Sequence, residues 1–154
     1  WGLWGSKYLT RDFFDALASP SLRENVVLFS ANRNGEDSSI AMSLCIANQE
    51  CLWGRYWGAR EDLDYLHFET CYYAPLQWAL EHGIHTFDPG AGGNHKRRRG
   101  FIVKPSVSFH RWYVSSIDSL IRSWLIESNK LMLDEISAVN ADLPFSCKGP
   151  KLIK

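Results

Sequence analysis

Residues 26–47 read VVLFSANRNGEDSSIAMSLCIA and decide the first part of the fold. Two apolar runs flank a polar segment, NGED, at residues 34–37. An Asn-Gly dipeptide between such runs is a strong short-range signal for a β-hairpin, because both residues tolerate the left-handed backbone of a tight turn. We therefore predict two antiparallel strands joined by a turn at residues 34–37.

The sequence on either side of this hairpin predicts further elements. Thr10 precedes a short helix that ends before Ser19 and Pro20. Residues 51–58, CLWGRYWG, predict a third antiparallel strand. Residues 66–82 show helical apolar spacing and stop at Gly83.

Pro75 lies inside that second helical segment, where it lacks a backbone donor and is expected to bend the helix or to mark a helix that restarts. Residues 84–88 predict a short strand beside the earlier ones, and the alternation at 107–114 predicts another. Ser115 or Ser116 is expected to cap a long helix. Its apolar stripe comprises Ile117, Leu120, Ile121, Trp124, Leu131 and Ile136.

Composition limits the class of protein. A chain of 154 residues has the size of one domain. Seventeen basic and seventeen acidic residues leave no net charge that would draw the whole molecule to nucleic acid or membrane. No apolar run reaches the roughly 18 residues of a membrane-spanning helix. The 7 Trp, 6 Tyr and 8 Phe indicate an aromatic core or a groove that stacks on a ligand.

The spacing of the cysteines and histidines does not indicate a metal site. Gly83 separates His82 from His85, and no cysteine completes a zinc site. The four cysteines contain no C-x-x-C pair and no disulfide framework, so reduced thiols in a cytoplasmic protein are expected. They are Cys45, Cys51, Cys71 and Cys147. The chain begins at Trp1 rather than Met, and we expect a piece of a longer protein.

Three groups of residues are candidates for chemistry. In the loop at 89–100, glycines bracket the run KRRR, which predicts either an anion clamp or a solvated basic loop. Arg55 lies among Trp53, Tyr56 and Trp57, where it either contacts a substrate or pairs with an acid. Candidate acids are Glu61, Asp62, Asp64 and Glu69. The third group gathers acid, base and phenol side chains near one helix end: His67, Glu69, Tyr72 and Tyr73.

Several motifs in one order carry a resemblance to a known family. They are GRYWG at 54–58, LHFETCYY at 66–73, QWALEHG at 77–83, FDPGAGGNHK at 87–96, RGF at 99–101 and SFH at 108–110. Over residues 8–133 the chain resembles the Fem-related GNAT-like N-acyltransferase family, predicted N-acyltransferases linked to peptidoglycan biosynthesis or recognition. The loop differs from the family's usual Gly-Ala-Gln-Gly-Glu-His-Lys at Gly92 and Asn94.

The resemblance implies an α/β (α+β) fold of the GNAT-like acyl-CoA N-acyltransferase type, with a mixed, mostly antiparallel sheet flanked by helices. Residues 1–143 are then a single GNAT-like domain and residues 144–154 a tail. Family members are generally longer, so this chain resembles the C-terminal domain, with the missing N-terminal domain as a partner.

The implied activity is transfer of an acyl or aminoacyl group to an amine of a small molecule or peptide, in peptidoglycan-related metabolism. Glu69 or His95 is the expected base, and Tyr72 or Tyr73 the expected acid. The expected substrate-binding residues are Arg55, His67, Gly90, Gly93, Lys96, Arg99 and His110. Residues after Trp57 lack the Arg/Gln-x-x-Gly-x-Gly/Ala signature of acetyl-CoA enzymes, so the donor stays open, with acyl-CoA and aminoacyl-tRNA as the two candidates.

Two other functions are consistent with the same residues. One is a non-catalytic recognition domain that binds a cell-wall fragment or peptide. The other is an aminoacyl-tRNA-dependent transferase in which the arginine loop holds tRNA phosphates.

Overall fold

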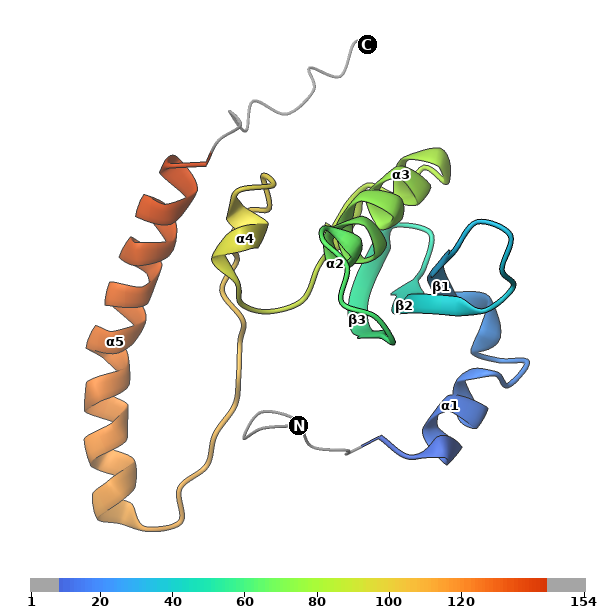
Figure 1. Cartoon of the computed structure of the whole chain (residues 1–154). Coiled ribbons are helices and arrows are strands. Elements are labelled where there is room, and N and C mark those ends of the chain that lie inside the picture. The colour runs from blue at the N-terminus through green and yellow to red at the C-terminus, as the bar shows by residue number, and fades with distance from the viewer. Residues whose placement is uncertain (1–8, 144–154) are drawn as a thin grey trace. The chain divides into compact units, whose positions relative to one another are not determined.

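The computed structural model describes residues 9–143 (Figure 1). These residues fall into two compact units, divided between Ala91 and Gly92. The predicted tail at 144–154 lies outside the described residues. A single GNAT-like domain over residues 1–143 stays a prediction.

The predicted hairpin is confirmed. Strands β1 (Val26–Asn32) and β2 (Ser39–Ala47) are antiparallel, with Val26 opposite Ile46. In the connecting turn Gly35 has φ 83°, and the Glu36 N–H donates to the Arg33 carbonyl at 3.0 Å. Gly35 therefore adopts a positive φ, a backbone conformation that glycine reaches at little energetic cost.

The third and fourth strands complete a mixed sheet in the order β1-β2-β3-β4. Strand β3 (Cys51–Ala59) is antiparallel to β2, as predicted. Strand β4 (Thr86–Asp88) lies beside β3 in parallel orientation. The fold is thus mixed α/β, with antiparallel pairs on one side and one parallel pair at the edge.

A register shift interrupts β3 at Arg55. Leu44 is opposite Tyr56, but its neighbour Cys45 is opposite Gly54, so Arg55 is an extra residue on β3. Because side chains alternate along a strand, one extra residue exchanges the faces of everything beyond it. The shift therefore places Trp57, rather than Tyr56, opposite the buried Ser43.

The helical segment after β3 is irregular. It consists of α2 (Leu66–Phe68), the π-helical turn η2 (Glu69–Tyr73) and α3 (Ala74–Glu81). Pro75 lies in the first turn of α3, directly after the π-helical turn, and the helical backbone continues from η2 into α3 without a break. The irregularity expected at Pro75 is thus a π-helical turn in a continuous helical segment. The predicted stop is confirmed: Gly83 has φ 68°, and the Ile84 N–H donates to the Ala79 carbonyl at 2.8 Å.

The core of this unit lies between the sheet and α3. Leu52 on β3 is 0% exposed. The Ser43 hydroxyl on β2 donates to the Thr70 carbonyl of η2 at 2.7 Å, which ties the sheet to the π-helical turn. The buried cluster comprises Cys45, Ala47, Leu52, Ala79 and Ile84, with Val27, Phe29, Trp78 and Phe87 half-buried around it.

Two short helices precede the sheet. Helix α1 (Arg11–Leu17) has the predicted position, with Thr10 at its N-cap. The 3-10 turn η1 (Arg23–Asn25) leads into β1. The Phe13 ring of α1 meets the Tyr56 ring edge to face, with centroids 6.5 Å apart. The Arg55 shift thus leaves Tyr56 available for α1.

The second unit contains α4 (Asn94–Arg97) and α5 (Ser115–Ala141). The long helix is confirmed, but its N-cap is Val114, and Ser115 is already its first helical residue. Side chains of the predicted apolar stripe are exposed to solvent: Leu120 is 70% exposed and Trp124 is 62% exposed. Among residues 9–143, no helix combines the length and hydropathy needed to cross a bilayer.

The predicted strand at 107–114 is wrong. Residues 101–112 have no regular secondary structure. Val107 is 80% exposed and Phe109 95% exposed. Alternation of apolar and polar residues forms a strand only when a neighbouring strand supplies hydrogen bonds, and this segment pairs with none of the described strands.

Candidate functional site

His67 stands in an aromatic cluster formed by β3 and the helical segment. Its ring centroid lies 4.9 Å from Trp57, 5.4 Å from Phe68 and 5.5 Å from Tyr72. The Arg55 shift supplies Trp57 to this cluster, because it exchanges the faces of the strand beyond it. The structure therefore brings together two predicted site residues, His67 and Tyr72.

The π-helical turn carries three of the four predicted catalytic residues. Glu69 is exposed, and Tyr73 is 48% exposed. Tyr72 is only 5% exposed and packs beside His67 and Phe68. A π-helical turn widens the backbone and occurs often at functional sites. Of the two tyrosines, Tyr73 has the phenol that a substrate in solution can reach.

Arg55 is exposed on β3. Its predicted partner Glu61 instead pairs with Arg33, with Nε and Oε1 3.3 Å apart. Among the described residues Arg55 forms no ion pair, so its charge is available to an anion. It does act on Cys45: burial raises the pKa of that thiol to about 11, while the Ser43 hydrogen bond and the Arg55 charge oppose the rise.

Gly90 follows β4 in a side-chain-supported turn. Its N–H donates to Asp88 Oδ1 at 2.8 Å, and its φ is 83°. An Asp that accepts from the backbone two residues on forms an Asx turn, and the positive φ favours glycine. Gly90 therefore forms the turn that follows β4.

In the second unit the structure brings Gly93, His95 and Arg99 together. Gly93 has φ 92°, and a Cβ there would lie 2.5 Å from His95 Cε1. The Arg99 guanidinium donates to the His95 carbonyl at 2.8 Å. Partial burial, and then the positive charges of Lys96 and Arg99, lower the pKa of His95 below its ordinary value. The lowered pKa favours the neutral imidazole, which is the form that can accept a proton.

His110 has local contacts. Its Nε2 lies 2.9 Å from the Ser108 hydroxyl, and its ring stacks on Trp112 with centroids 5.6 Å apart. His110 lies in the exposed segment without secondary structure, so the strand that was predicted to carry it is absent.

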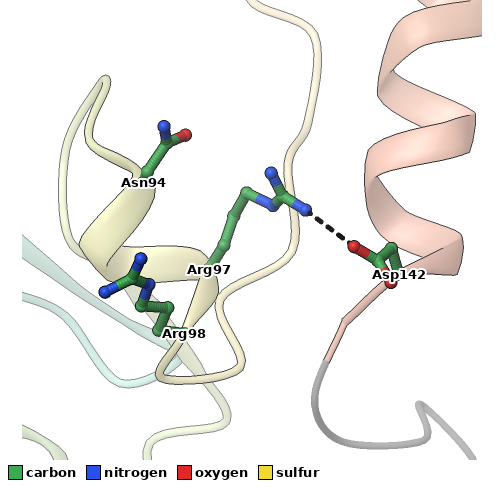
Figure 2. A pocket seen from close by; sticks show the side chains of 4 residues that line it. All are labelled: Asn94, Arg97, Arg98 and Asp142. Atoms are coloured by element: carbon green, nitrogen blue, oxygen red, sulfur yellow. Dashed lines mark ion pairs between the residues drawn. The ribbon is translucent and has the colours of Figure 1, made fainter.

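A hollow of about 490 Å³ lies in the second unit, lined by Asn94, Arg97, Arg98 and Asp142 (Figure 2). Arg97 Nη2 is 3.6 Å from Asp142 Oδ2. The arginines belong to the run that the sequence singled out, but no sequence signal indicated Asp142, since it lies at the end of α5.

No three His, Cys, Asp or Glu side chains gather into a metal-binding group within the described part of the chain. His82 stacks on Trp78, with centroids 4.1 Å apart, and its Nδ1 lies 2.8 Å from the Trp78 carbonyl. His82 is therefore the C-cap residue of α3, and its ring packs on the last turn of that helix.

Residues 2–147 match the FemAB-like family, described as acting in peptidoglycan biosynthesis/recognition. The chain belongs to this family. Neither the curated proteins nor the solved structures contain a significant match to it.

Proposed function

We propose that this chain transfers an acyl or aminoacyl group to an amine in peptidoglycan-related metabolism. The observation that carries the proposal is the position of His95 in a chain of the FemAB-like family. It follows the positive-φ Gly93, its carbonyl accepts from Arg99, and partial burial and nearby positive charges lower its pKa. An amine attacks a carbonyl only after it loses a proton, and a base that is neutral at pH 7 can accept that proton.

The reaction forms a C–N bond and breaks the C–O or C–S bond to the donor. Within the first unit, Glu69 takes the amine proton and Tyr73 returns a proton to the leaving group. His95 of the second unit is the alternative base. Tyr72 supports His67 within the aromatic cluster. Lys96 and Arg99 lie in the cationic loop, and Arg55 is a third cation that can hold an anionic part of donor or acceptor.

The proposal includes a GNAT-like fold and a place as the C-terminal domain of a longer protein. The mixed sheet and the helical segment with its π-helical turn support the fold. Cytoplasmic location is likewise part of the proposal. The donor is acyl-CoA or aminoacyl-tRNA, and the acceptor is an amine of a small molecule or peptide.

The test measures acyl transfer to a cell-wall peptide amine from each donor class. Of Glu69→Gln and His95→Ala, the variant that removes the base should abolish transfer while thermal stability stays nearly unchanged. Leu52→Ala is the structural control, because an emptied core site should cost about 2–5 kcal/mol of stability. Wild-type transfer by both site variants would contradict the proposal.

A second candidate is a recognition domain that binds a cell-wall peptide without chemistry. The aromatic cluster favours it, because Trp57 is 42% exposed beside His67 and can stack on a ligand. A recognition domain would bind the acceptor but show no turnover with either donor. A transferase that depends on aminoacyl-tRNA would lose RNA affinity steeply as salt rises.

A further inference from the structure

The hollow beside α4 combines several hydrogen-bond donors with one exposed carboxylate. Asn94 and Arg97 belong to α4, Arg98 follows directly, and Asp142 caps the C-terminal end of α5 (Figure 2). The volume of about 490 Å³ suits a small molecule. Two guanidinium groups and one carboxylate leave the hollow with a net positive charge.

Arg97 has hydrogen-bonding capacity left over. Its Nε is buried and has no hydrogen-bond partner in the part of the chain that is described. Its ion pair with Asp142 spans 3.6 Å, and the Asp142 side chain is 90% exposed. Long, exposed pairs are weak, and a buried donor without an acceptor is unfavourable. An added oxygen anion would pair more closely with the Arg97 Nη atoms than the long contact to Asp142 does.

The position of Asp142 does not depend on this weak pair. Two residues earlier, the Asn140 side chain makes two hydrogen bonds of 2.8 Å with the Val103 backbone. Asp142 is therefore held near Arg97 at a high effective concentration. A free monocarboxylate would only replace it, whereas a phosphate dianion can neutralise both arginines.

We propose that this hollow binds the phosphate group of a small molecule through Arg97, Arg98 and Asn94, and that Asp142 is an internal competitor that the ligand displaces. The site does not depend on the proposed acyl transfer, and its residues are not those assigned to that reaction.

The experiment titrates the whole chain with inorganic pyrophosphate by calorimetry at constant ionic strength. Asp142→Asn should tighten binding by about threefold or more, because the competitor is removed. Arg97→Gln and Arg98→Gln should each weaken it by about tenfold. Arg111→Gln is the matched control, because this substitution also removes one positive charge from the second unit. Arg111 lies over the Tyr113 ring and is not among the residues that line the hollow.

Asp142→Asn keeps the test decisive if Arg97→Gln fails to fold, since Asp142 is exposed. Succinate should bind more weakly than pyrophosphate. Equal affinity of Asp142→Asn and wild type would overturn the proposal. Binding of single-stranded RNA but not pyrophosphate, weakened equally by Arg111→Gln, would also overturn it, because it would indicate a diffuse basic surface.

Discussion

Asn140 and Val103 exchange two hydrogen bonds of 2.8 Å each: Asn140 Oδ1 accepts from the Val103 N–H, and Asn140 Nδ2 donates to the Val103 carbonyl. The carboxamide thus satisfies both polar groups of a residue in a segment without regular structure. The pair joins residues 37 positions apart, and it holds this segment to the C-terminal end of α5.

Asn140→Ala should destabilise the second unit by about 1–3 kcal/mol, because it leaves two partly buried backbone groups without partners. Hydrogen exchange at the Val103 amide should accelerate in the same variant. Asn129→Ala is the control, since Asn129 is exposed on the same helix. Equal Val103 exchange in both variants would show that the pair is unimportant.

Lys96→Met should raise the pKa of His95 toward its ordinary value of 6.5, because it removes one of the charges that disfavour the imidazolium. NMR titration of the His95 ring measures this. Lys104→Met removes a lysine elsewhere in the unit and should leave the titration unchanged. If the pKa of His95 is the same in wild type, Lys96→Met and Lys104→Met, the Lys96 charge does not contribute to the lowered pKa.

The lowered pKa of His95 also sets the sign of a stability change. In the window between its folded pKa and 6.5, the unfolded chain binds more protons than the folded one. Stability is therefore full above 6.5 and falls as pH drops through the folded pKa. His95→Gln should flatten this part of the curve of unfolding free energy against pH, and an unchanged curve would contradict the sign.

The Cys45 thiol should react slowly at pH 8, because its pKa of about 11 leaves little thiolate and burial restricts access. Alkylation followed by peptide mass spectrometry should label the half-buried Cys51 first and Cys45 only after denaturant is added. Equal labelling rates in the native protein would show that Cys45 is accessible.

Gly93→Ala should displace the His95 ring, since the new Cβ would lie 2.5 Å from Cε1, and it should cost about 1–3 kcal/mol through its positive φ. Gly92→Ala is a matched control. Gly92 has φ 73° but no atom within 4 Å of its Cβ position, so it shares the backbone cost without the clash. Only Gly93→Ala should shift the His95 ring signals.

Local patterns predicted the elements whose signals lie within a few residues. The Asn34-Gly35 turn and the Gly83 stop each depend on the φ of one glycine. The alternation at 107–114 predicted a strand that is absent, because strand formation depends on a neighbour that the pattern does not contain.

Local sequence was enough to predict the hairpin, the third strand, the first and the long helix and the concentration of donors at 89–100, but not α4, which forms inside the expected loop. The motifs in their order also indicated the FemAB-like family. The extra residue at Arg55, the pairing of Glu61 with Arg33, the parallel orientation of β4 and the contact of Arg97 with Asp142 emerge only in the folded chain. Backbone conformation follows from neighbouring residues, whereas register, burial and ion pairing depend on which distant segments come into contact.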